Sequence, residues 1–452
     1  MNILAKGSLL RKQFVLMSGD IIVSMAVITF AESIGLQNDS PQMLLGYSDF
    51  FFILVLILSS YFCEIYNIRR WVFKKSFIRT FMAAFITYLI FILLSIFFGY
   101  SWHIVIVISL FFMFQILWQG LYNKIIHSSY FSKNVVVIGT GTNALEINKI
   151  INAFPGKYNF SGYISTPADQ IDVDKKKIIG KTDDIIEICK QYKVYAIILA
   201  LTERRGNLTI NKLISCKLIG VRIIDYPNFY EAMTGKIPVE SINPSWLVHS
   251  SGFLVTPFIR VMKRILDIIF SSLLLLITMP FFPLIVFLTK YESPGPIFYL
   301  QQRVGENGKN FTIYKFRTMK IDAEHETGAA WAMESDPRIS KFGHLLRIIR
   351  IDELPQLINV FNGKMSFIGP RPERPEFVEQ ICKATPYYME RHAVKPGITG
   401  WAQVMYPYGA SLGDSVEKLR YDLYYINNLS LFLELLIVFK TIKVILFRKG
   451  SR

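Results

Sequence analysis

The chain has 452 residues, which is enough for roughly two to four domains. A hydrophobic content of 52% with only 19% charged residues excludes an ordinary soluble enzyme and indicates a membrane protein. The formal net charge of +16 favours anionic partners, and because long apolar segments accompany it, we expect lipid headgroups and phosphate groups rather than nucleic acid.

Four apolar runs open the chain, at residues 14–35, 50–66, 78–98 and 102–122, and each approaches the ~20 residues that a helix needs to cross a bilayer. We therefore predict a domain of four transmembrane helices over residues 1–133. Lysines and arginines flank the runs on one side only, whereas the loops at 35–49 and 99–101 carry none. The positive-inside rule then places the N-terminus and everything after the fourth helix in the cytoplasm. Asp20, inside the first run, is a functional charge, a helix contact or a residue near the membrane interface.

From residue 134 the pattern changes to short strands that alternate with helices. Residues 135–138 (Val-Val-Val-Ile) predict a buried strand, and residues 139–144 (Gly-Thr-Gly-Thr-Asn-Ala) resemble the turn of dinucleotide-binding domains. With further strands expected at 160–165, 195–201 and 220–224, we predict a doubly wound, Rossmann-like domain within residues 134–250, ending near residue 226 and followed by a linker.

Cofactor binding by this domain is a separate question. The strand that would supply a ribose-binding acid ends in Tyr-Ile-Ser-Thr (163–166), and the chain contains no Tyr-x-x-x-Lys pair of a short-chain reductase. We therefore expect no bound cofactor and a structural, oligomerising or regulatory role, with a working NAD site as the alternative.

The next apolar run, residues 265–289, is long enough to cross the membrane. Crossing would export the basic region that follows it, against the positive-inside rule. Pro280 and Pro283 each remove a backbone donor and bend a helix near the middle of the run. We therefore predict a re-entrant helix hairpin that enters and leaves on the cytoplasmic face, and a fifth spanning helix with a proline kink is the alternative.

A basic region follows, with a strand-like stretch at residues 311–316 that would bring Lys315 and Arg317 onto one strand face. These two side chains contact phosphate directly or belong to a solvated charge cluster at lipid headgroups. The glycine-containing stretch 396–400 predicts a loop that passes close to a ligand, with Gln403 available to hydrogen-bond a base or sugar; a plain turn is the alternative.

Two adjacent carboxylates, Asp352 and Glu353, lie in an apolar stretch with Arg347 and Arg350 before them and Arg371 between two prolines after them. Carboxylate oxygens hold Mg²⁺ or attack phosphorus, and arginine forks neutralise charge on a phosphate. The alternative is an ordinary salt-bridged helix start, because the proline at 355 fits a first helical turn.

Six segments in the second half share one family pattern: 293–296 (Ser-Pro-Gly-Pro), 301–305 (Gln-Gln-Arg-Val-Gly), 314–319 (Tyr-Lys-Phe-Arg-Thr-Met), 352–356 (Asp-Glu-Leu-Pro-Gln), 366–372 (Ser-Phe-Ile-Gly-Pro-Arg-Pro) and 395–404 (Lys-Pro-Gly-Ile-Thr-Gly-Trp-Ala-Gln-Val). Together they closely resemble the bacterial sugar transferases that move a hexose 1-phosphate onto polyprenyl phosphate. The likeness runs from about residue 260 to the C-terminus, and the preceding helices and nucleotide-fold insert resemble the long polytopic subgroup of exopolysaccharide synthesis.

The resemblance implies a monotopic α/β phosphoglycosyl transferase domain over residues 251–452, with a UDP-sugar, undecaprenyl phosphate and Mg²⁺ as its ligands. It implies that Asp352 attacks the sugar-bearing phosphorus to give a covalent phosphosugar enzyme and UMP. Residue chemistry alone equally allows Asp352 to be only a metal ligand, and leaves Glu353 between metal positioning and proton transfer. The substrate- and phosphate-binding candidates are the basic and amide side chains Arg303, Lys315, Arg317, Arg347, Arg371 and Gln403.

The family's re-entrant helix is usually broken at a Ser-Pro pair, whereas Met279 precedes the proline here. This departure leaves the break in place and puts its stabilising hydroxyl contact in doubt. At the C-terminus, residues 418–447 alternate aromatic, aliphatic and basic side chains, which is typical of helices lying at the membrane interface, with Tyr421 and Tyr425 at headgroup depth.

The expected location is the bacterial inner membrane, with the catalytic domain on the cytoplasmic face. The four cysteines have no Cys-x-x-Cys spacing, which predicts neither a zinc site nor a disulfide framework and fits a reducing cytoplasm: Cys63, Cys189, Cys216 and Cys382. The sugar, glucose or galactose by subgroup, and any homo-oligomer through the membrane and Rossmann-like domains stay open. The alternative functions are an NAD-dependent nucleotide-sugar dehydratase or epimerase built on residues 134–226 and a non-catalytic scaffold for polysaccharide assembly.

Overall fold

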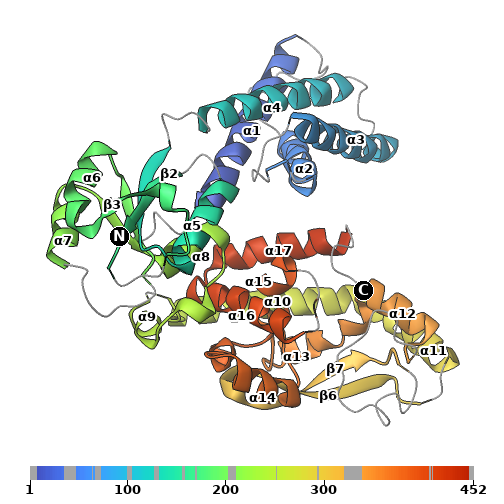
Figure 1. The fold of residues 1–452 in the computed structure, drawn as a ribbon. Coiled ribbons are helices and arrows are strands. Elements are labelled where there is room, and N and C mark those ends of the chain that lie inside the picture. Colours follow the sequence, from blue (N-terminus) through green and yellow to red (C-terminus); the bar gives the residue numbers. More distant parts are fainter. Residues whose placement is uncertain are drawn as a thin grey trace. The chain divides into compact units, whose positions relative to one another are not determined.

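The structure is a computed structural model of the chain (Figure 1). It describes residues 8–34, 47–63, 65–66, 73–98, 104–126, 132–154, 158–167, 171–201, 210–250, 252–292, 295–319, 338–406, 409 and 411–446. The loops between the first four helices, on which their predicted orientation rests, lie outside these residues. The chain folds into two compact units, Met1–Thr234 and Gly235–Arg452.

The described part of the first unit begins with four apolar helices: α1 (Ser8–Ser33), α2 (Tyr47–Phe62), α3 (Phe73–Phe98) and α4 (Ile104–Ile126). Stretches in α1, α3 and α4 are long and apolar enough to cross a membrane, whereas α2, with 16 residues, is shorter. Large apolar side chains such as Phe81 and Leu117 are exposed on the outer faces, as a lipid environment requires. The protein is therefore a membrane protein, and a crossing by α2 stays a prediction.

Asp20 of α1 is completely buried in a polar contact between helices. Its Oδ2 atom accepts hydrogen bonds from Tyr66 Oη at 2.7 Å and Gln115 Nε2 at 2.5 Å, and Gln115 also donates to Ser60 Oγ at 3.0 Å. Polar groups inside a membrane domain normally face its interior and pair with one another. Of the interpretations of Asp20, the structure supports a helix contact.

The rest of the first unit is a five-stranded parallel sheet, as far as the structure describes it, in the order β3-β2-β1-β4-β5. The strands are β1 (Lys133–Ile138), β2 (Tyr158–Ser165), β3 (Ile178–Lys181), β4 (Ala196–Leu199) and β5 (Arg222–Asp225). Four of them lie where the sequence predicts strands. The strand β3 was not among the predicted strands, because it has only four residues and no alternating pattern to reveal it.

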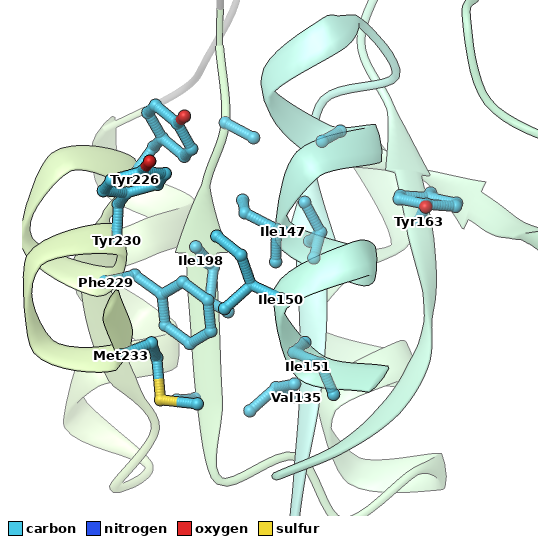
Figure 2. Close-up of a cluster of buried hydrophobic side chains, with 14 of the residues drawn as sticks. Val135, Ile147, Ile150, Ile151, Tyr163, Ile198, Tyr226, Phe229, Tyr230 and Met233 are labelled. Atoms are coloured by element: carbon cyan, nitrogen blue, oxygen red, sulfur yellow. The ribbon is translucent and has the colours of Figure 1, made fainter. Parts of the chain in front are cut away.

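Helices cover both faces of this sheet. One face packs on α5 (Thr142–Ala153) and α8 (Tyr226–Thr234), and the other on α6 (Ile185–Gln191) and α7 (Ile210–Leu218). Figure 2 shows the first core, in which Phe229 and Met233 of α8 approach Ile150 of α5. Val135 and Val137 of β1 join this core and Val136 joins the other, because alternate residues of a strand point to opposite faces.

The second unit begins earlier than the sequence suggests. Residues 235–250 were expected to be a linker, but they contain η3 (Val239–Ser241) and α9 (Pro244–His249). Ile237, Val239 and Trp246 are buried in one core with Leu419 and Leu423. This stretch therefore belongs to the second unit, because its apolar side chains are buried against that unit.

The described part of the second unit is mainly helical, with two small sheets. An antiparallel pair joins β6 (Phe298–Val304) to β7 (Asn310–Phe316), the strand predicted at 311–316, and a parallel pair joins β8 (Ser366–Ile368) to β9 (Gly397–Thr399). The longer helices are α10 (Pro257–Thr278), α11 (Phe282–Glu292), α12 (Lys341–Ile348), α14 (Pro375–Ala384), α16 (Leu412–Asn427) and α17 (Leu431–Leu446).

The apolar run at 257–292 is one of the segments long enough to cross a membrane, and it is broken in the middle. A 3-10 turn, η4 (Met279–Phe281), separates α10 from α11 and contains Pro280. The Thr278 hydroxyl donates to Leu274 O at 2.7 Å, so a hydroxyl contact does accompany the break. Pro283 was expected to bend the helix, but it lies in the first turn of α11, where backbone amides have no intrahelical partner to lose.

Both ends of this run are anchored on the second unit itself. Lys263 Nζ on α10 donates to Ile368 O of β8 at 2.8 Å, and Asp267 Oδ1 accepts from the Phe367 amide at 2.8 Å. In α11, Ile285 packs with Phe316 and Leu346, and at the end of the helix the Glu292 carboxylate accepts from the Phe342 amide at 3.1 Å. Between the anchors, the outer face exposes a large apolar surface, which includes Leu273, Leu276, Ile277, Met279, Phe281, Leu284 and Phe287.

The C-terminal helices differ from the prediction of two interfacial helices. In α16, Tyr421 and Tyr425 are buried rather than placed at headgroup depth, because this helix packs into the core through Leu419 and Leu423. Only α17, which contacts α10 (Figure 1), has an exposed apolar face, formed by Phe432, Leu435, Phe439, Ile442 and Ile445.

Candidate active site

The carboxylate pair lies on a tight turn between two helices of the second unit. Ser340 caps α12 by accepting from the Gly343 amide at 2.9 Å, and α12 ends at Ile348. Arg350 then adopts a left-handed backbone with φ 56° and ψ 23°, which is uncommon for a residue other than glycine and turns the chain into η6 (Ile351–Glu353). Asp352 and Glu353 follow, only 8% and 9% exposed, before α13 (Gln356–Phe361) begins.

Glu353 is held by cations from three elements of the described chain. Arg371 Nη2 lies 2.8 Å and Lys315 Nζ 3.4 Å from its Oε1 atom, and Arg350 Nη1 lies 4.0 Å from Oε2. Burial raises the pKa of Glu353, but the attraction of Arg371, Lys315 and Arg350 outweighs it and holds this pKa well below its usual range. Glu353 is therefore ionised at neutral pH, and two of its three partners, Arg371 and Lys315, come from distant segments, unlike those of a local helix start.

The pKa of Asp352 is shifted in the opposite direction. Burial and the neighbouring Glu353 charge raise its pKa to about 6, although Lys315, Arg347 and Arg371 oppose the shift. No described residue donates a hydrogen bond to its carboxylate. Neighbouring carboxylates whose pKa values are pushed apart are typical of a site where they have different roles.

The other predicted residues fall into two groups. Lys315, Arg347 and Arg371 surround the carboxylates; Arg347 is fixed by donating from Nε to Thr318 Oγ1 at 2.9 Å. Arg303 instead supports the backbone beside Arg371, with Nη1 donating to Pro372 O at 3.1 Å.

Arg317 is buried directly after β7. Gln403, on α15 (Trp401–Met405), donates to Ile398 O at 3.0 Å, so it contacts β9 rather than the carboxylates. Its buried Oε1 atom has no hydrogen-bond partner among the described residues. The structure therefore does not bring Gln403 to the predicted site through any described contact.

The glycines of the motif at 366–372 and of the loop at 395–400 have a packing role. A Cβ atom on Gly397 would lie 2.1 Å from Gly369 N, so β8 and β9 approach too closely for any other residue. This close approach sets the position of the Pro-Arg-Pro segment (370–372), from which Arg371 reaches Glu353.

Sequence reasoning missed a buried ion pair behind this segment. Arg391, in η7 (Met389–Ala393), and Asp422 of α16 lie 2.8 Å apart (Nη2 to Oδ2) and are almost fully buried. Nothing in the local sequence connects them, since 31 residues separate the two.

The carboxylates can be compared with the needs of Mg²⁺. The described residues contain no group of three or more His, Cys, Asp or Glu side chains that could hold a metal ion. Mg²⁺ is commonly bound by one or two carboxylates together with substrate phosphates, rather than by a complete protein cage. Asp352, which lacks a hydrogen bond from the described residues, fits such a site, whereas Glu353 Oε1 is already shared by two cations.

The chain resembles a known protein family and several known proteins. The model of the family described as "Bacterial sugar transferase" matches residues 258–448. A UDP-glucose:undecaprenyl-phosphate glucose-1-phosphate transferase of Xanthomonas campestris pv. campestris is 31% identical over 349 residues, which cover 74% of this chain and 70% of the relative. A UDP-N-acetylgalactosamine-undecaprenyl-phosphate N-acetylgalactosaminephosphotransferase of Aeromonas hydrophila is 41% identical over 240 residues, 53% of this chain.

A third relative, a UDP-glucose:undecaprenyl-phosphate glucose-1-phosphate transferase of Escherichia coli (strain K12), is 42% identical over 187 residues, 40% of each chain. The matched region spans 56% of the Aeromonas relative, so the likeness covers about half of that protein. The match to the Xanthomonas relative, in contrast, extends over most of both chains. The chain belongs to the bacterial sugar transferase family.

Proposed function

We propose that this protein transfers a hexose 1-phosphate from a UDP-sugar to undecaprenyl phosphate and releases UMP, the initiating step of exopolysaccharide or related glycan synthesis. One observation carries the proposal: a buried, ionised Glu353 holds Arg371 and Lys315 beside Asp352, whose carboxylate is not engaged by any described donor. This arrangement suits an anionic diphosphate, and the relatives are named for transfers of this class.

The chemistry assigned to Asp352 is nucleophilic attack. One carboxylate oxygen bonds to the sugar-bearing phosphorus, the bond from that phosphorus to the bridging oxygen breaks, and UMP leaves with the electron pair. A phosphate oxygen of the lipid then attacks the same phosphorus and frees the Asp352 carboxylate. An aspartate with a pKa of about 6 is largely ionised at neutral pH, and a carboxylate free of hydrogen bonds is more nucleophilic.

The role of Glu353 follows from its partners. A group whose pKa lies well below its usual range does not donate a proton at neutral pH, so proton transfer is the weaker of its two expected roles. Its charge instead fixes Arg371 and Lys315, which neutralise the charge of the diphosphate. Mg²⁺, when bound, supplies further neutralisation of the diphosphate, and Asp352 with Glu353 Oε2 would hold it.

We place the catalytic unit on the cytoplasmic face of the bacterial inner membrane, with α10 and α11 as a re-entrant element. Lys263 anchors the start of this element to β8, and Ile285 anchors its second half to the core near β7. Attachment of both halves of the segment to one folded unit supports a path that enters and leaves on the same side of the bilayer. The exposed apolar faces of α10 and α17 give this unit a surface for the lipid.

For the sheet of the first unit we propose a Rossmann-like domain without a cofactor. The strand order β3-β2-β1-β4-β5 and the turn at Gly139 and Gly141, which opens α5, support this fold. Ser165 ends β2, where NAD-binding domains of this type carry an acidic residue. An oligomerising or regulatory role therefore fits this domain better than dehydratase or epimerase chemistry.

The proposal is tested with the purified full chain in lipid nanodiscs that contain undecaprenyl phosphate. A panel of UDP-sugars, including glucose, galactose and N-acetylgalactosamine, is scored by UMP release and by transfer of radiolabelled sugar to lipid. We expect one donor to give equal amounts of UMP and labelled lipid, with loss of both when Mg²⁺ is chelated. Without lipid acceptor, the intact protein mass should rise by one phosphosugar.

Two outcomes would overturn the proposal. A changed sugar that stays on UDP would favour an NAD-dependent dehydratase or epimerase. Full polysaccharide synthesis in cells that carry only Asp352→Asn would favour a scaffold.

A further inference from the structure

The backbone that carries Arg371 is held at four consecutive carbonyl oxygens. Gly397 N donates to Pro370 O at 2.9 Å, Arg391 Nη2 to Arg371 O at 2.9 Å, Arg303 Nη1 to Pro372 O at 3.1 Å and Val304 N to Glu373 O at 3.0 Å. Pro370 and Pro372 have no backbone N–H, so the segment cannot form a regular strand ladder of its own. Its position therefore depends on these four donors.

Arg391 is the only donor of the four that is itself held by a buried countercharge within the described residues. It is 4% exposed, and its Nε and Nη2 atoms both donate to Asp422 Oδ2, at 3.0 and 2.8 Å. The same Nη2 carries the second hydrogen that reaches Arg371 O. Tyr388 Oη accepts from Nη1 at 3.2 Å and completes the orientation of the guanidinium.

Stability alone does not explain why Arg391 and Asp422 form a buried ion pair. Burying two charges removes both from water at a cost in free energy, and replacing such a pair by apolar residues is often neutral or stabilising. Here the pair orients the Arg391 side chain. The planar guanidinium of arginine can donate to a carboxylate and a carbonyl at once, which the single ammonium of lysine does not reproduce. Asp422 fixes the orientation of the Arg391 guanidinium, and the guanidinium fixes the position of the Arg371 carbonyl.

We infer that Arg391 and Asp422 are positioning residues, which hold the Arg371 backbone so that its guanidinium stays on Glu353 beside Asp352. The inference rests on the proposed function of the Asp352–Glu353 site. The Arg371 side chain is 35% exposed and makes its 2.8 Å contact with Glu353 from a segment without regular secondary structure. Such a side chain keeps its place only if its backbone does, and a misplacement of about 1 Å can cost on the order of 100-fold in rate.

The test begins with Arg391→Lys in the full chain in nanodiscs. This variant keeps a positive charge for Asp422 but loses the fork that reaches Arg371 O. We expect kcat for UMP release to fall by roughly 10- to 100-fold, the size typical of groups that orient a reacting site, with a smaller change in KM for the UDP-sugar. Asp422→Asn, which keeps the shape of the side chain, should act in the same direction and serves if Arg391→Lys fails to fold.

The matched control is Glu417→Gln, on the same helix as Asp422. Glu417 pairs with Lys236 and Arg420, and none of these contacts involves the Pro370–Glu373 backbone. Its kcat should stay within about twofold of wild type, as for substitutions away from a critical contact. An equal loss in Glu417→Gln would show a general effect of ion pairs on this helix and overturn the inference.

A double-mutant cycle separates positioning from a merely structural role. If Arg391 acts through Arg371, adding Arg391→Lys to Arg371→Lys should lower kcat no further than Arg371→Lys alone. Losses that multiply would mean that Arg391 acts independently of Arg371, and the inference would fail.

A readout that needs no turnover distinguishes this failure from failure of the proposed function. Hydrogen exchange of the Val304 and Gly397 amides, which donate to Glu373 O and Pro370 O, reports whether the segment has loosened. Both amides should exchange faster in Arg391→Lys and at the wild-type rate in Glu417→Gln. Unchanged protection in Arg391→Lys would overturn the positioning role, even if wild-type protein released no UMP and the proposed function had already failed.

Discussion

Arg371 Nη2 lies 2.8 Å from Glu353 Oε1, although 18 residues separate the two along the chain. The two neighbouring carboxylates therefore differ in their pKa values: that of Glu353 is lowered and that of Asp352 is raised. Arg371 and Lys315 form ion pairs with Glu353, whereas the pKa of the neighbouring Asp352 stays above its usual value.

Asp352→Asn should abolish turnover, by on the order of 10³-fold or more, and should also stabilise the protein. The pKa of Asp352 is about 6 in the folded state, above its unfolded value near 4, so the ionised carboxylate destabilises the fold as pH rises through this window. Removing the charge should add roughly 1–3 kcal/mol at pH 7.5. Thermal unfolding in nanodiscs at pH 7.5 checks this gain, which should vanish near pH 4. Activity equal to wild type would remove Asp352 from the mechanism.

Glu353→Gln should have the opposite effect on stability. Its folded pKa is lowered, so its contribution is complete above the unfolded value and is lost as pH falls through the folded value. The neutral amide would leave Lys315 and Arg371 without their buried anion, which should cost roughly 3 kcal/mol at pH 7.5. The unfolding temperature of the two variants, measured side by side, should move in opposite directions. A drop for both would mean that the pair acts as one structural unit.

The rate of UMP release should fall tenfold per pH unit below pH 6, because Asp352 must be ionised to attack phosphorus. Lys315→Met removes a charge that lowers the pKa of Asp352, so its acid limb should move to higher pH. Lys309→Met, on the turn between β6 and β7, is the matched control and should leave the limb in place. If the acid limb does not move in Lys315→Met, the limb is produced by a group other than Asp352.

Lys263 and Glu434 form a buried ion pair between α10 and α17, with Nζ to Oε2 at 2.7 Å. Lys263→Met alone should destabilise the protein by roughly 3–5 kcal/mol, because it leaves the buried Glu434 carboxylate without its countercharge. The double variant Lys263→Met with Glu434→Gln should recover most of this loss. Apparent unfolding temperatures of wild type, both single variants and the double variant measure the coupling, and additive losses would contradict it.

The re-entrant arrangement predicts that both ends of the α10–α11 element face the cytoplasm. Leu254 precedes α10 and Tyr291 lies in the last turn of α11; they are 82% and 84% exposed, and each can be replaced by cysteine in a background without the native cysteines. A membrane-impermeant maleimide should label both in inside-out vesicles and neither in intact spheroplasts. Labelling of Tyr291→Cys from the periplasmic side would show a spanning helix and place the catalytic unit on the wrong side.

Several features of the fold could be predicted because they depend on neighbouring residues. Long apolar runs predict α1, α3 and α4, and short runs of β-branched or aromatic residues predict β1, β2, β4 and β5. The carboxylates of the site are adjacent, so the local sequence was enough to single out Asp352 and Glu353. Pro280 breaks the long run as expected, because a missing backbone donor acts locally.

Only the tertiary structure decided the features that depend on distant partners. Trp246 was expected in a linker and lies in a core; Tyr421 and Tyr425 were expected at the lipid surface and are buried. Gln403 turned out to contact β9, and Arg391 and Asp422 met across 31 residues. The sequence by itself determined which segments are apolar and which side chains carry chemistry, since both are properties of single residues and short periods. Which charges meet, and which are buried, depends on long-range packing that no local pattern contains.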